Sequence, residues 1–249
     1  MLAFLPANCL SAPKKTAWPQ AASNVTIQDI STPRRLTIKM NQLASSNQLN
    51  PYAIQLCALG RWISAKQWAP AGSGNFSIRL NEHSALVTPA YKDKAELSPQ
   101  DLALLTWHNT QPNQNPTLSP CTLLHSTIYQ LVSSARVVLQ TQSVAAIVFS
   151  RLMRADQHLF CGYDLQQLIQ PETRHQAGVN LPILDANLTW PQLARELEHR
   201  QHQLNSAFLV RGQGLYVWAD NLEQAKRQLE AWEFLFSCEL ERLKVSGQL

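Results

Sequence analysis

The stretch RGQGLYVW at residues 211–218, read together with LQTQS at residues 139–143, decides the fold of this chain. In the second of these stretches, Gln140 and Gln142 lie two positions apart, the spacing at which a strand directs both side chains to one face. In the first, Gln213 stands between two glycines, and apolar residues on both sides of it predict two strands joined by a turn. The chain therefore presents three glutamines at the ends of predicted strands.

Apolar spacing predicts the elements around these stretches. Helical spacing predicts helices over residues 50–66, 121–134, 143–153, 162–169, 190–204 and 221–244. Strands are predicted after the glycine-rich turn within residues 70–79 and over residues 85–88, 102–107, 137–142, 181–184, 207–211 and 215–218. Because strands outnumber crossover units, we expect an α/β fold with α+β layering, in which a central, mixed and mostly antiparallel sheet is flanked by helices.

The bulk composition indicates one medium domain with an extension. With 249 residues, 28.0 kDa and 45% hydrophobic residues, the chain is long enough to bury a sizeable core. Residues 1–47 are rich in polar residues and proline without periodicity, so we expect a poorly ordered N-terminal extension there and the folded domain at residues 48–249. Met1 and Met40 are both candidate starts, and the N-terminus lacks the basic segment of a signal peptide.

Charge and cysteine content narrow the expected partners and compartment. The net charge of +4 is mild and the basic residues are scattered, so we expect no nucleic-acid partner. The longest apolar stretch, at residues 144–148, is too short to span a bilayer, and we expect no membrane partner. Five cysteines, an odd number without a Cys-x-x-Cys pair, predict reduced thiols and a cytoplasmic location.

Three motifs resemble those of one enzyme family. Residues 139–143 resemble the His-Thr-His-Ser motif of the class II aldolase superfamily. Residues 211–218 resemble the Arg-Gly-His-Gly-Leu-Tyr-Val-Trp-Gly of its methylthioribulose-1-phosphate dehydratases, as does LEAWEFLF at residues 229–236. The resemblance covers residues 50–243 and implies a class II aldolase-like fold, a cytosolic homotetramer and a place in methionine salvage. The implied reaction is loss of water from a ketose phosphate, in which zinc polarises the ketone while a carboxylate moves protons.

The resemblance places Gln140, Gln142 and Gln213 at the positions of the family's three zinc ligands. A neutral imidazole binds Zn²⁺ tightly, whereas an amide oxygen suits hard cations such as Ca²⁺ or Mg²⁺. Three neutral amides without a carboxylate bind any divalent ion weakly. We therefore expect zinc to be weakly bound or absent, unless His125 or His175 supplies a ligand to a rearranged site.

Two loops resemble the family's phosphate-binding segments. Residues 71–77, AGSGNFS, are similar to its Gly-Gly-Asn-Phe-Ser, and residues 88–94, TPAYKDK, to its Thr-Pro-Ser-Gly-Lys-Asp-Lys. The alternatives are a structural hairpin turn for the first loop and an exposed surface lysine in the second. The resemblance implies that the substrate or its phosphate contacts Ser73, Gly74, Asn75, Thr88 and Lys92.

Cys121 and Asp164 are the candidate catalytic residues. Cys121 stands where some members of the family carry a substrate-pocket cysteine, and Asp164 where they carry a catalytic glutamate. Aspartate is a competent acid/base, but it is shorter than glutamate, and a misplacement of about 1 Å can cost on the order of a hundredfold in rate. The alternatives are a packed thiol and a helix-surface aspartate. No carboxylate stands near Cys121, which argues against a sugar-phosphate aldolase.

Several functions remain open at this point. The first is a methylthioribulose-1-phosphate dehydratase-family protein with impaired catalysis, acting on a sugar phosphate if it is active. The second is a non-catalytic pseudoenzyme that serves as a binding or assembly subunit, and a weaker third is another sugar-phosphate aldolase or lyase. Trp232, Phe234 and Phe236 lie close together on the last predicted helix, which suits a subunit contact and predicts a homo-oligomer, most simply a tetramer.

Overall fold

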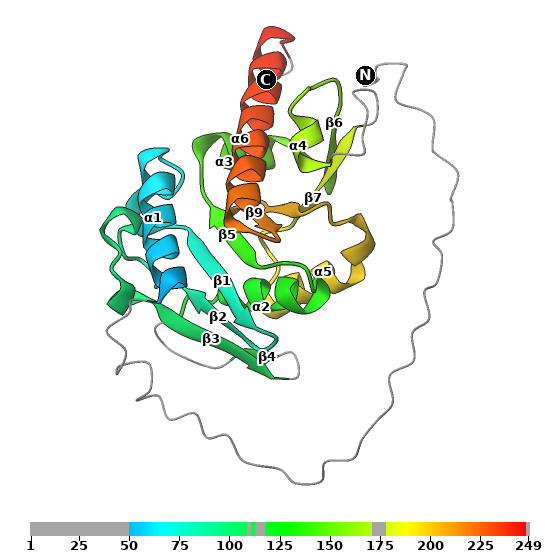
Figure 1. The fold of residues 1–249 in the computed structure, drawn as a ribbon. Helices are drawn as coiled ribbons and strands as arrows, with labels where there is room; N and C mark the ends of the chain where they lie inside the picture. Colours follow the sequence, from blue (N-terminus) through cyan, green and yellow to red (C-terminus); the bar gives the residue numbers. More distant parts are fainter. Residues whose placement is uncertain (1–49, 109–110, 113–117, 171–177, 248–249) are drawn as a thin grey trace, which may run out of the picture. The chain divides into compact units, whose positions relative to one another are not determined.

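The computed structural model describes residues 50–108, 111–112, 118–170 and 178–247 (Figure 1). The predicted extension at residues 1–47 and the candidate ligand His175 lie outside these ranges. The described residues from Asn50 onward form one compact unit. Among them, no helix is long and apolar enough to cross a membrane.

One sheet of nine strands runs through the described part of the chain, in the order β4-β3-β2-β1-β5-β9-β8-β7-β6. Neighbouring strands pair antiparallel except β7 and β8, which are parallel, so the predicted mixed and mostly antiparallel sheet is confirmed. The strands are β1 (Asn75–Asn81), β2 (Ser84–Val87), β3 (Ala103–His108), β4 (Gln111–Pro112), β5 (Val137–Thr141), β6 (Gln157–Phe160), β7 (Val179–Leu184), β8 (Ala207–Val210) and β9 (Gly214–Ala219).

Helices cover both faces of the sheet (Figure 1). They are α1 (Pro51–Ala65), α2 (Thr122–Leu131), α3 (Val144–Leu152), α4 (Gln166–Ile169), α5 (Trp190–His199) and α6 (Leu222–Val245). Residues of α1, α3, α4 and α6 share one apolar core, and residues of α2 and α5 share the other. Strand β5 divides between the two cores, with Leu139 in the first and Val138 in the second, as alternation along a strand requires.

The first helix begins and packs for identifiable reasons. The Asn50 side chain accepts a hydrogen bond from the Tyr52 amide, and Pro51 occupies the first turn, where its missing N–H costs nothing. Gly60 lies in the helix interior, where glycine is unfavourable. A Cβ atom there would lie 2.4 Å from the carbonyl oxygen of Lys94, so the close approach of α1 to the 88–97 segment requires glycine.

The structure corrects several details of the sequence-based prediction. Strand β6 was not predicted, because its residues are largely exposed and lack clear alternation. The helix predicted over residues 162–169 is wrong in its first half: Gly162 has a φ of +87°, and α4 begins only at Gln166. The helix predicted over residues 190–204 ends at His199 and continues as a short 3₁₀ turn, η5 (Gln201–Gln203). Cys57, Cys121 and Cys238 are free thiols.

Candidate functional site

A cavity of about 510 Å³ gathers most of the residues that the sequence singled out. It lies where the glycine-rich loop before β1, the end of β5 and the β8–β9 turn meet. Its walls carry all three glutamines of the ligand positions, four residues of the glycine-rich loop and the candidate catalytic cysteine. The lining residues are Pro70, Ala71, Gly72, Ser73, Gly74, Ala90, Tyr91, Ser119, Cys121, Gln140, Gln142, Trp190 and Gln213.

The glycine-rich loop forms the first wall and needs its glycines. Gly72 and Gly74 have positive φ angles of +73° and +80°, which residues with a Cβ rarely adopt. A Cβ on Gly74 would also lie 3.0 Å from the carbonyl oxygen of Gln140, so the loop lies directly against β5. The hydroxyl of Ser73 is buried without a hydrogen-bond partner among the described residues. This wall therefore offers a small polar group and closely approachable backbone.

A buried lysine holds this wall in place. The Nζ atom of Lys94 donates to the carbonyl oxygens of Gly72 at 2.6 Å, Lys92 at 2.8 Å and Pro89 at 3.3 Å. Its side chain is fully buried, and this burial lowers the pKa of Lys94 to about 8. The ammonium thus joins the two loops that the sequence assigned to phosphate. Lys92 was predicted from the sequence in this segment and Lys94 was not, because burial of one lysine in a polar loop has no local signal.

The ends of β5 and β9 form the second wall. Gln140 is 5% exposed, and its Nε2 donates to the main-chain carbonyl of Gln213 at 2.9 Å. Gly214 has a φ of +114°, and a Cβ there would lie 2.0 Å from the carbonyl oxygen of Thr141. The β8–β9 turn is therefore pressed against β5 and fastened to it by the amide of Gln140.

Helix α3 braces both glutamine-bearing segments. Its N-cap is Ser143, directly after Gln142, and the Ser143 hydroxyl accepts from the Ala146 amide at 2.9 Å. At its C-terminal end, the guanidinium of Arg211 donates to the carbonyls of Ser150, Met153 and, at 3.1 Å, Ala155. A cation there satisfies carbonyls that the helix leaves unpaired. One helix therefore fixes the segment before Gln213 and the segment after Gln142.

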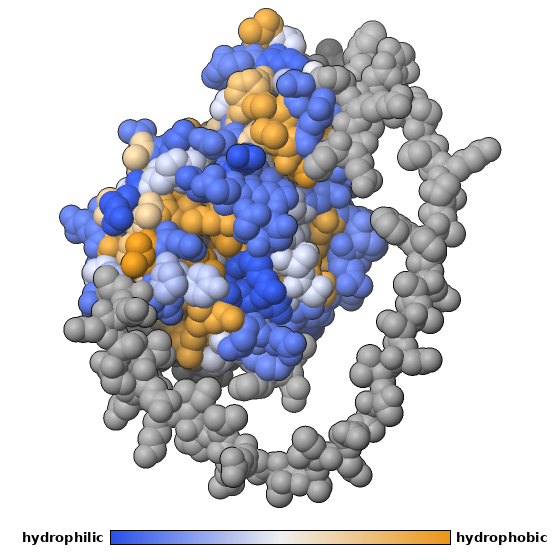
Figure 2. Space-filling view, viewed as in Figure 1, coloured by the Kyte–Doolittle hydropathy of each residue, from blue (hydrophilic) through white to orange (hydrophobic). Residues whose placement is uncertain are grey.

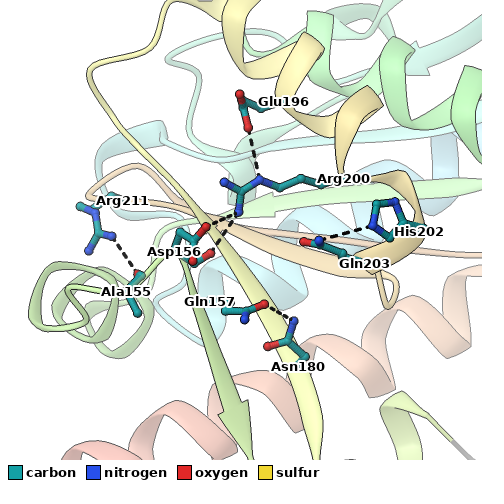
Figure 3. A network of polar contacts seen from close by, with 9 residues as sticks. All are labelled: Ala155, Asp156, Gln157, Asn180, Glu196, Arg200, His202, Gln203 and Arg211. Carbon is teal, nitrogen blue, oxygen red and sulfur yellow. Dashed lines mark hydrogen bonds and ion pairs between the residues drawn. The ribbon is translucent and has the colours of Figure 1, made fainter.

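A second arginine braces the loop that Arg211 reaches (Figure 3). The guanidinium of Arg200, at the end of α5, contacts Asp156 at 3.1 Å and Glu196 at 3.2 Å. Asp156 follows Ala155, whose carbonyl accepts from Arg211. The residues beneath the β8–β9 turn are thus held from two sides.

Cys121 lines the cavity as a neutral thiol. Its Sγ donates to the Ser119 hydroxyl at 3.1 Å, and burial raises the pKa of Cys121 to about 11. Tyr216 is its neighbour, and burial likewise raises the pKa of Tyr216. At neutral pH this cysteine is therefore a weak hydrogen-bonding group rather than a nucleophile.

Four of the predicted site residues do not line this cavity. Thr88 and Asn75 are buried and tie β1 to β2: Phe76 N donates to Thr88 Oγ1 at 3.0 Å, and Asn75 Nδ2 to the Thr88 carbonyl at 2.9 Å. Lys92 forms an ion pair with Asp101 at 2.5 Å. Asp164 is exposed at the turn before α4. The functional roles predicted for these four residues stay predictions.

The donor set of the cavity does not fit zinc. Its candidate ligands are three neutral amides, which bind zinc poorly, and the thiol of Cys121, which burial keeps protonated. Nor does His125 approach them. It is a fully buried residue of α2, its Nδ1 lies 2.8 Å from the Ser77 hydroxyl, and burial lowers its pKa to about 3. Across the described ranges, no group of three or more His, Cys, Asp or Glu residues could hold a metal ion.

A buried carboxylate, which was not predicted from the sequence, lies beside this site. A second cavity, of about 610 Å³, is lined by Ser143, by Glu233, by the segment that follows α1 and by residues of α3, α4 and α6. The Ser143 hydroxyl donates to Glu233 Oε2 at 2.5 Å, and burial raises the pKa of Glu233 to about 7. An acidic residue inside the apolar run at residues 229–236 was the available signal.

Several known proteins are similar to this chain in sequence. The family of the Class II Aldolase and Adducin N-terminal domain matches residues 54–240. A methylthioribulose-1-phosphate dehydratase from Yersinia enterocolitica is 39% identical over 189 residues, which is 75% of this chain and 90% of the relative. The enzyme of that name from Pectobacterium carotovorum is 37% identical over 195 residues, 78% of this chain and 95% of the relative.

Solved structures show the same fold at lower identity. The l-fuculose-1-phosphate aldolase from Thermus thermophilus superposes with a TM-score of 0.64 at 18% identity, covering 78% of this chain and 97% of its own. An aldolase II superfamily protein from Pseudomonas syringae gives a TM-score of 0.64 at 16% identity, covering 82% of this chain and 80% of its own. At these identities the likeness establishes the fold alone.

Proposed function

The chain belongs to the methylthioribulose-1-phosphate dehydratase family, within the class II aldolase superfamily, and on this premise we propose that it keeps the family's cavity without its zinc-dependent dehydration. One observation carries the proposal. Every position that the resemblance assigns to a zinc ligand holds a neutral amide, and the amide of Gln140 is bound to the Gln213 carbonyl. A site of this composition cannot compete with imidazole for zinc.

The remaining groups around the cavity support the same proposal. Cys121 is held as a neutral thiol, and Asp164 is exposed outside the cavity lining. A general acid or base must lie within hydrogen-bond reach of the proton that it transfers. The role we propose in methionine salvage, in the cytoplasm, is therefore that of a family member whose dehydration of methylthioribulose 1-phosphate is impaired.

A second candidate function is a non-catalytic assembly subunit, and the surface near the second cavity favours it. Val144 is 79% exposed and Phe234 is 49% exposed, and Val148 and Leu168 add further exposed apolar area on α3 and α4. Figure 2 shows apolar surface along the part of the molecule where α6 projects. Exposed apolar patches of this kind mark protein contacts. We propose a homotetramer, which light scattering tests; a monomer at micromolar concentration would exclude it.

Zinc content and turnover test the main proposal together. Purified full-length chain should hold well under one zinc per subunit and release little or no product from methylthioribulose 1-phosphate. The Yersinia enterocolitica relative, prepared in parallel, is the control for metal loading. Stoichiometric zinc and normal dehydration by the unmodified chain would overturn the proposal.

Restoring the ligands tests the reason for the loss. The variant carrying Gln140→His, Gln142→His and Gln213→His should recover close to one zinc per subunit, because imidazole replaces each amide. Adding Asp164→Glu tests the acid/base position as a separate step. If the triple variant folds yet still fails to bind zinc, the three positions are not the family's ligand set in this chain.

A further inference from the structure

Among the described residues, none that lines the cavity has a formally charged side chain. Its lining contains three amides, two serine hydroxyls, a thiol, a phenol and an indole, and no Asp, Glu, Lys, Arg or His from the described residues. The two nearby lysines are engaged elsewhere. Lys92 pairs with Asp101, and the three donors of the Lys94 ammonium are directed to main-chain carbonyls. The described lining of the cavity therefore offers a phosphate ester no cationic side chain.

The amides form a polar surface suited to neutral hydroxyl groups. Each glutamine offers an acceptor oxygen and an NH₂ group with two donors, and Gln140 uses a donor on the Gln213 carbonyl. Gln142 and Gln213 are only partly buried, so their amides remain within reach of a ligand. The hydroxyl of Ser73, unpartnered within the described part of the chain, adds a further group on the facing loop. A hydroxyl, which both donates and accepts, is the natural complement of such a surface.

Two aromatic side chains border the same cavity. Tyr91 is 90% exposed, and its backbone is fixed beside the glycine-rich loop: a Cβ on Gly72 would lie 2.8 Å from the Tyr91 carbonyl oxygen. Trp190 is partly buried at the first turn of α5. Aromatic rings supply apolar contact area, and a thioether sulfur packs favourably against their edges. The cavity therefore combines an amide wall with aromatic edges, the composition of a small-molecule site with a few orienting polar groups.

We propose that this cavity binds an uncharged sugar bearing an apolar substituent, in preference to a sugar phosphate. The sugar hydroxyls pair with the amides of Gln142 and Gln213, and the apolar substituent packs on Tyr91 and Trp190. The inference rests on the proposed loss of zinc-dependent turnover, because it concerns a cavity that holds ligand without reacting with it.

Isothermal titration calorimetry on the full-length chain tests the inference with three matched probes. The buffer contains a chelator, which removes contaminating metal ions. The probes are 5-methylthioribose, D-ribose and 5-methylthioribose 1-phosphate. We expect 5-methylthioribose to bind, D-ribose to bind about tenfold more weakly because it lacks the apolar group, and the phosphate ester to bind at least about tenfold more weakly than the free sugar. Tighter binding of the phosphate ester, or no heat with any probe at millimolar concentration, would overturn the inference.

Variants locate the binding. Trp190→Ala and Tyr91→Ala should each weaken 5-methylthioribose binding by roughly tenfold, and Gln142→Ala by several-fold. Tyr52→Ala is the matched control, because Tyr52 is also an exposed aromatic residue but lies on α1 outside the cavity lining. Circular dichroism confirms that each variant is folded. Equal losses in Tyr52→Ala and Tyr91→Ala would contradict the assignment.

The two proposals fail in distinguishable ways. Stoichiometric zinc and turnover would overturn the proposed function whatever the titration gives. A chain without zinc or turnover that binds none of the sugars would overturn only the present inference.

Discussion

The supports of the cavity and the side chains at its ligand positions differ in how they contact the rest of the protein. The supports either donate hydrogen bonds to main-chain carbonyls or pack closely against the backbone. Lys94 joins two loops, Gly214 packs against Thr141, and Arg211 binds the end of α3. The ligand positions carry glutamines in place of the histidines of the resemblance: the amide of Gln140 donates to the Gln213 carbonyl, and Gln142 and Gln213 are only partly buried. The contrast separates the residues that hold the fold from the residues that the resemblance assigns to metal, so substitutions at the two kinds of position are expected to differ in their effect on stability.

The largest effect is expected at the most crowded support. Gly214→Ala would place a Cβ 2.0 Å from the Thr141 carbonyl oxygen, in a backbone conformation with a φ of +114°. We expect a loss of more than about 4 kcal/mol in the free energy of unfolding, or failure to fold. Gly212→Ala is the control, because a Cβ at that position would meet no described atom within 4 Å, and it should lose only about 1 kcal/mol. Denaturant titration measures both.

The second largest loss of stability is expected from removing the buried ammonium of Lys94. Lys94→Met removes hydrogen bonds to three main-chain carbonyls, and the gain from no longer burying a charge offsets part of this loss. We expect the variant to lose about 3 kcal/mol of stability. Lys92→Met, which breaks a half-exposed ion pair in the same segment, should lose less than about 1 kcal/mol. Equal losses in the two variants would show that Lys94 is not a specific support.

The buried carboxyl of Glu233, which binds the Ser143 N-cap of α3, gives a pH-dependent test on the side of the supports. Its pKa is about 7 in the folded chain, against an ordinary value of 4.5, so folding takes up a proton between these pH values. Its contribution to stability is therefore greatest below pH 4.5, falls as the pH rises to about 7, and is constant above that. Relative to Glu233→Gln, the unmodified chain should lose about 3 kcal/mol between pH 4.5 and pH 8. A constant difference across this range would contradict the assignment.

The smallest effects are expected at the ligand positions. Gln140→Ala removes the hydrogen bond to the Gln213 carbonyl and should lose about 1 kcal/mol of stability. Gln142→Ala keeps the main-chain hydrogen bond from residue 142 to the Trp68 carbonyl and should change stability by less than about 0.5 kcal/mol. Losses as large as that of Lys94→Met would erase the distinction between supports and ligand positions.

Much of the fold followed from local patterns in the sequence. The helix at α1, the strands at β5 and β9 and the final helix α6 were predicted because each has a clear apolar period and a recognisable start or end. Strand β6 was missed because its pairing with β7, rather than its own alternation, defines it. Four residues of helix were overpredicted after residue 161, because the φ of Gly162 was not foreseen.

The sequence predicted which residues form the site, but not their burial or the hydrogen bonds between them. The resemblance placed Ser73, Cys121 and the three glutamines in one site, and the structure brings them around one cavity. The burial of Lys94 and of Glu233 could not be read from the sequence, because both depend on which segments fold over them. The hydrogen bond from Gln140 to the Gln213 carbonyl likewise joins residues 73 positions apart, a distance over which local patterns carry no information.

The strand order also has a consequence for how the chain is made. Strands β1, β2, β3 and β5 end by residue 141, but the other neighbour of β5 is β9, which begins at Gly214. During translation the hydrogen-bonding edge of β5 must therefore wait for more than a quarter of the chain to be synthesised. An unpaired strand edge is a template for aggregation. We expect truncated nascent chains that end before β9 to depend on chaperones, and full-length chains to be released from them.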